Sequence, residues 1–181
     1  MKRHVALTGF MASGKSTIGR KLARKLACSF FDTDALVVRA HGSIPAIFEG
    51  DGEGERTFRE YERSAIATAL ESLETSVIAL GGGALTLPEN RRIVSARAHC
   101  IFIKVAPEQI LARVRRSREI RPLLGSTPTL ERIKELYATR MPEYESVDYV
   151  VDAARRSDTQ VIAEILEWLR RQKFALPALA S

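Results

Sequence analysis

The chain has 181 residues, of which 45% are hydrophobic and 28% are charged, and its formal net charge is +6. This length predicts a single domain over residues 1–181 with a core of its own. No apolar run approaches the roughly 18 residues of a membrane-spanning helix, and the first residues lack the apolar core of a signal peptide. We therefore expect a cytoplasmic protein that has no membrane partner.

Neither the positive charge nor the cysteines point to a specific partner. The basic residues are spread along the chain rather than gathered in one tail or one helix face, so we expect no nucleic-acid partner. Cys28 and Cys100 are far apart in the sequence and lack the spacing of metal ligands. Buried, reduced thiols are therefore the expected state of both.

The first expected strand and helix enclose a glycine-rich motif. Residues 5–8 are a short apolar run, and residues 17–26 carry apolar side chains at helical spacing. Between them, residues 9–16 match the pattern G-x-x-x-x-G-K-[ST] at every fixed position. Glycines in such a loop let backbone N–H groups turn toward phosphate oxygens at a helix N-terminus. The motif predicts a phosphate-binding loop in which Lys15 reaches the β- and γ-phosphates and the Ser16 hydroxyl binds Mg²⁺.

The next expected strand spans residues 29–34 and ends in two acids. Because residues two apart in an extended chain point to the same side, Asp32 and Asp34 are expected to face one site.

Apolar spacing and turn residues predict the remaining elements. Helices are expected over 35–40, 44–48, 56–73, 88–96, 130–141 and 159–174 with one more starting at Pro107, and strands over 76–80, 99–105 and 147–151. Strands that alternate with helices indicate a parallel sheet covered on both faces, with its site at the carboxyl ends of the strands. We therefore expect an α/β fold with a five-stranded parallel sheet flanked by helices.

Three loops have compositions that bear on function. Residues 49–55 are acidic and rich in glycine, which predicts little regular structure. The glycines at 81–83 follow a strand and permit close backbone approach to a ligand, although a plain turn explains them too. Residues 113–122 are strongly basic with little apolar face, so they are expected to be exposed and mobile unless an anion orders them.

Together, a phosphate-binding loop, a magnesium-binding hydroxyl, two carboxylates and an arginine-rich flap are the components of a kinase for a small hydroxyl-bearing molecule. These residues resemble a known family, the shikimate kinases. The matching segments are 9–17, 31–34, 47–48, 58–59 with Glu62, 81–83, 121–124, and Arg140 with Pro142 and Tyr144. Apart from the phosphate-binding loop each segment is a weak signal, but together and in this order they are specific.

The resemblance implies a P-loop kinase fold like that of the nucleoside monophosphate kinases. It implies a mobile lid over about 113–128, substrate-binding helices over about 33–62, and a monomer. The implied reaction is the ATP-dependent phosphorylation of the 3-hydroxyl of shikimate, which gives shikimate 3-phosphate and ADP. ATP and Mg²⁺ are the implied cofactors, and shikimate is the implied partner.

The resemblance also implies roles for individual residues. Asp34 would be the catalytic base, assisted by Lys15 and Arg121. Shikimate would bind to Asp34, Arg59, Gly81, Gly82 and Arg140, with Arg59 and Arg140 on its carboxylate. ATP would bind to Ala12, Ser13, Gly14, Lys15, Ser16, Thr17, Arg116, Arg121 and Arg156. Mg²⁺ would be held by Ser16 and Asp32.

One stretch departs from the family pattern. Residues 49–57 are about two residues longer than the corresponding family segment, and either 52–53 or 54–55 can be the family's Gly-Glu pair. We expect Glu53 or Glu55 to compete with the substrate carboxylate for Arg59.

Two other functions stay open at this point. A kinase for gluconate or another small hydroxy acid shares the phosphate-binding loop, but it does not account for residues 58–59, 121–124 and Arg140 together. A nucleic-acid-binding P-loop ATPase would explain the positive charge, but it leaves Asp34 and the glycines at 81–83 unexplained.

Overall fold

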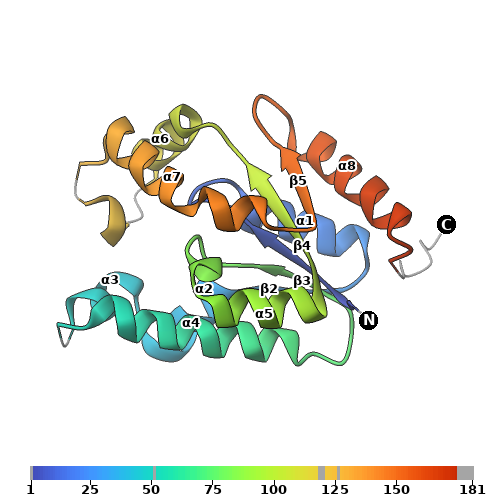
Figure 1. The fold of residues 1–181 in the computed structure, drawn as a ribbon, viewed down its shortest axis with the longest axis horizontal. Helices are drawn as coiled ribbons and strands as arrows, with labels where there is room; N and C mark the ends of the chain where they lie inside the picture. Colours follow the sequence, from blue (N-terminus) through green and yellow to red (C-terminus); the bar gives the residue numbers. More distant parts are fainter. Residues whose placement is uncertain (1, 51, 118–120, 126, 175–181) are drawn as a thin grey trace.

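The computed structural model describes residues 2–50, 52–117, 121–125 and 127–174. The helices are α1 (Lys15–Lys25), α2 (Thr33–His41), α3 (Ile44–Glu49), α4 (Gly54–Leu70), α5 (Pro88–Arg97), α6 (Pro107–Arg116), α7 (Leu130–Glu145) and α8 (Asp158–Arg171), with two short 3-10 helices, η1 (Ala84–Thr86) and η2 (Pro122–Leu124). The strands are β1 (His4–Thr8), β2 (Ser29–Asp32), β3 (Ser76–Ala79), β4 (Ala98–Lys104) and β5 (Tyr149–Asp152). Strands and helices alternate along most of the chain (Figure 1).

Within the described residues, the strands form one parallel five-stranded sheet in the order β2-β3-β1-β4-β5. Strand β1 is central: Val5 lies opposite Val77 of β3, and Leu7 lies opposite Ile101 of β4. All five residues of β1 are buried, as expected for a strand covered on both faces. The predicted fold class is confirmed, and the loops that follow β1, β2 and β3 meet at one edge of the sheet.

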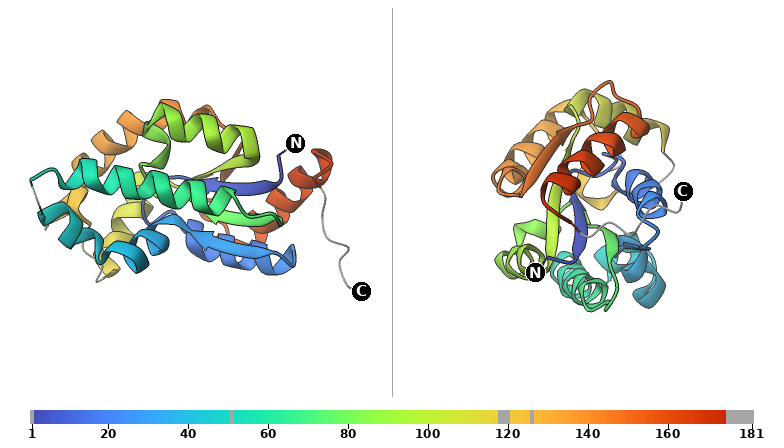
Figure 2. Two further views of the ribbon diagram at one scale, coloured as in Figure 1. Left: turned by 90° about the horizontal axis from the view of Figure 1, so that it is seen from below. Right: turned by 90° about the vertical axis from the view of Figure 1, so that its right-hand side faces the viewer.

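Two apolar cores lie on opposite faces of the sheet. Because side chains alternate along a strand, Val5 and Leu7 enter the core shared with α1 and α8, whereas Ala6 enters the core shared with α4 and α5. Figure 2 shows these helices on both sides of the sheet. A third, smaller cluster joins α2, α3 and α4. This cluster gives the segment 33–70 its own packing beside the sheet.

Strand β2 is shorter than expected, and the prediction of an extended chain through Asp34 is wrong. The side chain of Asp32 accepts a hydrogen bond from the N–H of Ala35 at 3.2 Å and so caps the start of α2. Asp34 therefore lies in the first turn of a helix. The two acids still reach one site, but by a cap and a helical turn rather than by the alternation of a strand.

Helix α4 starts earlier than expected and also ends earlier, at Leu70 rather than Leu73, and helix α7 extends beyond its expected end. Helix α4 starts at Gly54, where a side chain would overlap the backbone of Phe48, so the acidic loop is shorter than expected. Helix α7 continues through Pro142 to its end at Glu145. This places Arg140 and Tyr144 one helical turn apart on the same face.

The expected lid, 113–128, is described only in part, because residues 118–120 and 126 lie outside the described residues. The expectation that the basic stretch is exposed is wrong at Val114, which is buried in the last turn of α6. Downstream, Leu124 of η2 is also buried. The mobility of the lid stays a prediction.

Both cysteines are free, but only Cys100 is buried, and Cys28 is half-buried. The expectation of a buried thiol is therefore wrong for Cys28. Among the helices of the described segments, none combines the length and apolar character needed to cross a bilayer.

Candidate functional site

The phosphate-binding loop, residues 9–16, connects β1 to α1 in the expected way. Gly9 has φ 144° and Gly14 has φ 100°, which are left-handed conformations that glycine adopts without strain. A Cβ on Gly9 would also lie 2.7 Å from the carbonyl oxygen of Ile103. The first N–H groups of α1 have no acceptor within the helix, so the loop and the helix end together form an anion site.

Lys15 is a buried cation at the centre of this loop. Its Nζ donates to the carbonyl oxygens of Gly9 at 2.8 Å and Phe10 at 2.9 Å. Burial lowers the pKa of Lys15 to about 8, although the nearby carboxylates of Asp34 and Asp32 oppose this effect. A phosphate beside Lys15 would stabilise its charged form.

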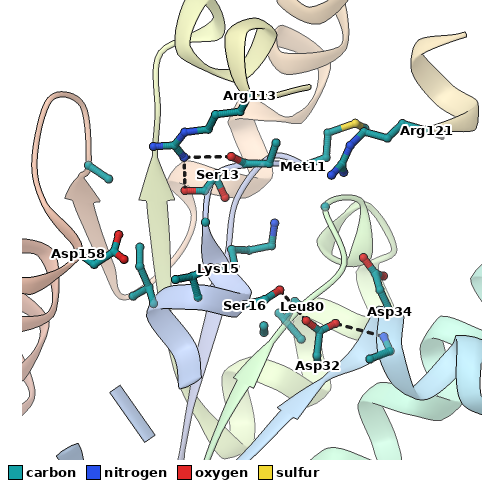
Figure 3. A pocket seen from close by; sticks show the side chains of 18 of the residues that line it. Met11, Ser13, Lys15, Ser16, Asp32, Asp34, Leu80, Arg113, Arg121 and Asp158 are labelled. Atoms are coloured by element: carbon teal, nitrogen blue, oxygen red, sulfur yellow. Dashed lines mark hydrogen bonds between the residues drawn. The ribbon is translucent and has the colours of Figure 1, made fainter. Parts of the chain in front are cut away.

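Ser16 and Asp32 place two oxygen groups together beside the loop. The Ser16 hydroxyl donates to Oδ2 of Asp32 at 2.6 Å (Figure 3). A hydroxyl and a carboxylate are the hard oxygen donors that Mg²⁺ prefers, so this pair fits the ion. The described segments hold no cluster of three or more His, Cys, Asp or Glu residues suited to a metal. A Mg²⁺ ion here would therefore share its coordination with substrate phosphates and water.

Two adjoining cavities open at the carboxyl edge of the sheet. The first, of about 760 Å³, is lined by the phosphate-binding loop and is called the loop cavity. The second, of about 540 Å³, is lined by Arg59 and Arg140 and is called the arginine cavity. The two share Met11, Asp34, Val38, Ile44, Gly82 and Arg121. Asp34 and Arg121 therefore lie where a group can pass from one cavity to the other.

The arginine cavity contains a pair of guanidinium groups from two different helices. Arg140 of α7 is buried, and its Nη1 donates to the carbonyl of Gly82 at 3.1 Å. Arg59 of α4 pairs with Glu62 at 2.7 Å and with Glu55 at 3.3 Å. Burial alone would lower the pKa of Arg59, but the two carboxylates raise it overall. Arg59 therefore remains charged, and together with Arg140 it can bind a carboxylate.

Glu62 is a fully buried carboxylate at the wall of the same cavity. Burial raises its pKa, Arg59 opposes that shift, and the charge of Asp34 adds to it. Its Oε1 accepts no hydrogen bond from the described residues. The ion pair of Glu62 with Arg59 thus restrains the guanidinium group in this cavity.

The acidic residues of the longer loop behave differently from one another. Glu55 reaches Arg59, whereas Glu53 pairs with Arg56 at 2.9 Å. Of the two expected competitors, only Glu55 therefore contacts Arg59.

The three glycines after β3 have distinct surroundings. Gly82 and Gly83 line the arginine cavity, and a Cβ on Gly83 would lie 2.5 Å from Nη2 of Arg59. Gly81 is not among the residues that line either cavity, and its N–H donates to Oγ1 of Thr33 at 2.9 Å. The expected contact of Gly81 with a ligand stays a prediction.

The structure brings most of the predicted residues to the two cavities. The loop cavity is lined by Ala12, Ser13, Gly14, Lys15, Ser16, Thr17, Asp32, Asp34, Arg121 and Arg156. Arg156 is held there by Glu164 and by the carbonyl of Asp152. Arg116 is different: it is exposed at the end of α6 and lines neither cavity. Its expected contact with ATP has no support in the geometry.

Several residues of the site received no role from the sequence. Glu62 belongs to a segment that matches the family, and its place one helical turn after Arg59 on the same face was a signal for a contact with that arginine. Arg113 lines the loop cavity, yet it lies in a run of arginines that offers no signal to single it out. The apolar walls formed by Phe48 and Pro122 depend on tertiary packing.

The family follows from comparison with known proteins. A family model described as shikimate kinase matches residues 11–170. The shikimate kinase of Geobacter sulfurreducens is 41% identical over 172 residues, which cover 94% of this chain and 93% of that protein. The chain belongs to the shikimate kinase family. As a member of this family, it is an ATP-dependent small-molecule kinase that uses Mg²⁺.

Solved structures of shikimate kinases have the same fold. The enzyme from Acinetobacter baumannii in complex with shikimate has a TM-score of 0.87 at 31% identity, covering 96% of both chains. The shikimate kinase from Aquifex aeolicus has a TM-score of 0.79 at 34% identity, covering 94% of this chain and 98% of that one.

Proposed function

We propose that this chain transfers the γ-phosphoryl group of ATP to the 3-hydroxyl of shikimate, giving shikimate 3-phosphate and ADP. The observation that carries this proposal is the junction of the two cavities, where Asp34 and Arg121 line both. A phosphoryl donor in the loop cavity and an acceptor in the arginine cavity would meet there. Phosphoryl transfer needs this positioning more than it needs covalent chemistry.

In this proposal the acceptor is held by its carboxylate. Arg59 and Arg140 bind it from two helices, and Gly82, whose carbonyl accepts a hydrogen bond from Arg140, lines the same cavity. Holding the carboxylate at one end fixes which hydroxyl faces Asp34. Two guanidinium groups in a partly buried cavity suit a carboxylate better than a neutral sugar or a base.

The groups at the junction have different roles in phosphoryl transfer. Asp34 accepts the proton of the attacking hydroxyl, while Lys15 and Arg121 stabilise negative charge on the phosphates. Ser16 and Asp32 would hold Mg²⁺, which when bound neutralises phosphate charge and orients the chain of phosphates. Arg156 lines the loop cavity and would contact the adenine.

The remaining parts of the proposal concern the whole chain. We propose one domain over 1–181, with acceptor-binding helices within 33–62, a lid within 113–128, and a monomeric state without nucleic-acid or membrane partners. Both thiols are free, which suits a reducing compartment such as the cytoplasm.

A substitution in the arginine cavity tests the proposed acceptor. We expect Arg140→Ala to raise KM for shikimate by about ten- to a hundredfold, because a charge-assisted hydrogen bond contributes about 1.5–3 kcal/mol. KM for ATP should remain nearly unchanged. The control is Arg132→Ala, which removes an exposed arginine from the same helix. ³¹P NMR of the wild-type product should show phosphate on the 3-hydroxyl. Phosphate on another hydroxyl would contradict the proposal, and so would an effect of Arg140→Ala that is confined to KM for ATP.

A further inference from the structure

Arg113 makes a contact with the phosphate-binding loop that the proposed reaction does not use. It lies in the last turn of α6, far from the loop in sequence. Its Nη1 donates to the carbonyl oxygen of Ala12 at 3.0 Å and to that of Ser13 at 2.9 Å. Figure 3 shows both hydrogen bonds running from the guanidinium group to the loop.

The backbone at this point adopts a conformation that needs support. Ala12 has φ 57°, a left-handed value that residues other than glycine adopt only when their surroundings hold them there. The carbonyl that Arg113 binds belongs to this same residue. The hydrogen bond therefore stabilises the strained conformation directly.

The second hydrogen bond sets the direction of a phosphate-binding group. In a planar trans peptide the carbonyl oxygen and the following N–H point in opposite directions. Since Arg113 holds the carbonyl of Ser13 on one side, the N–H of Gly14 is turned to the other side. Gly14 lines the loop cavity, so this N–H is available to a phosphate oxygen there.

A second cation supports a different part of the loop. Lys15 holds the carbonyls of Gly9 and Phe10, and the proposed function requires its ammonium group to bind the phosphates as well. Arg113 binds different carbonyls, on the Ala12–Ser13 part of the loop, and can keep them throughout.

We propose that Arg113 is a positioning residue that holds the phosphate-binding loop in its binding conformation. Helix α6 thereby sets the affinity of the loop for the polyphosphate part of the nucleotide, whatever base is attached. The inference rests on the proposed function only in taking the loop cavity as the ATP site.

The test compares R113M with R115M. Methionine keeps an unbranched apolar chain but has no N–H donor, and Arg115 is exposed on the same turn of α6 and lines neither cavity. Calorimetry gives Kd for Mg²⁺–ADP and for Mg²⁺–pyrophosphate, and hydrogen exchange follows residues 9–17 in the ligand-free protein. Steady-state kinetics gives the KM values for ATP and shikimate.

We expect R113M to raise both Kd values by about tenfold, equivalent to about 1.4 kcal/mol, and to raise KM for ATP similarly. KM for shikimate should stay within about twofold of wild type, and exchange in residues 9–17 should be faster. R115M should change none of these quantities by more than about twofold.

Other results overturn the inference. Weaker binding of ADP with unchanged binding of pyrophosphate means that Arg113 contacts the nucleoside. Weaker binding with unchanged exchange in residues 9–17 means that its charge attracts the phosphates directly.

If R113M fails to fold, judged by circular dichroism, R113Q takes its place with the same expectations, because its shorter side chain cannot reach both carbonyls. The wild-type protein is assayed in parallel, so absence of ADP binding or of shikimate turnover there contradicts the proposed function instead.

Discussion

At the scale of single residues, Lys15 links burial to a measurable pH dependence. Its pKa of about 8 lies below the ordinary 10.5 because the side chain is buried, so the ligand-free enzyme loses this charge above pH 8. Between about pH 8 and pH 10.5 the unfolded chain retains the Lys15 proton more than the folded protein does. The free energy of unfolding therefore rises as pH rises through this range.

We therefore expect kcat/KM for ATP to fall on the alkaline side with an apparent pKa near 8. Once ATP is bound, its phosphates stabilise the charged Lys15, so the corresponding decrease in kcat should lie at higher pH. Steady-state kinetics across pH at saturating shikimate measures both. A kcat/KM for ATP that stays constant up to about pH 9.5 contradicts this assignment.

Asp34 is expected to act in chemistry rather than in nucleotide binding. Asp34→Asn should lower kcat by about a hundredfold or more, since general-base catalysis contributes about 10²–10⁴. Calorimetric titration with Mg²⁺–ATP should give a Kd close to that of the wild type. Loss of ATP binding together with activity would assign Asp34 to the nucleotide or the metal, and the base would lie elsewhere.

The sequence singles out residues whose spacing reflects one local motif. Lys15 and Ser16 lie at the fixed positions of a contiguous pattern, and the structure places both in the loop cavity. Arg113 belongs to no such sequence pattern, because its role depends on how α6 packs against a loop about 100 residues earlier. Likewise, composition cannot decide between Glu53 and Glu55; the start of α4 does, by placing Glu55 one turn before Arg59.

At the scale of elements, η2 and the segment before it are expected to close over the acceptor. Arg121, Pro122 and Leu123 line the arginine cavity, so a bound acceptor would contact them. A non-hydrolysable ATP analogue with shikimate should therefore slow amide hydrogen exchange across 121–125. Exchange across α8 serves as the control. Equal exchange at 121–125 with and without both ligands would leave the segment a fixed wall rather than a lid.

Element boundaries were harder to predict than the elements themselves, because one was set by a side-chain cap and another by a tertiary contact. Asp32 caps α2 and ends β2 two residues early, although the sequence there is compatible with a longer strand. Pro142 suggests an end to α7, yet the helix continues because its last turn is fixed by Tyr144, which donates to the carbonyl of Gly82. That contact is tertiary and has no local signal.

At the scale of the whole molecule, the alternation of apolar strands and helices was enough to predict a parallel sheet. It could not give the strand order, in which β1 lies between β3 and β4. This order brings the loops after β1 and β3 side by side, so that Gly82 and the phosphate-binding loop line the same cavity. The joining of the two cavities is thus a consequence of topology, whereas their chemistry follows from residues visible in the sequence.

We expect the site to use one acceptor, and a coupled assay of ADP release tests this most directly. The purified protein with Mg²⁺–ATP is given shikimate, gluconate, a nucleoside monophosphate or no acceptor. We expect saturable ADP release with shikimate and only background release in the other three reactions. Activity with gluconate alone, or acceptor-independent hydrolysis that DNA stimulates, would contradict the account.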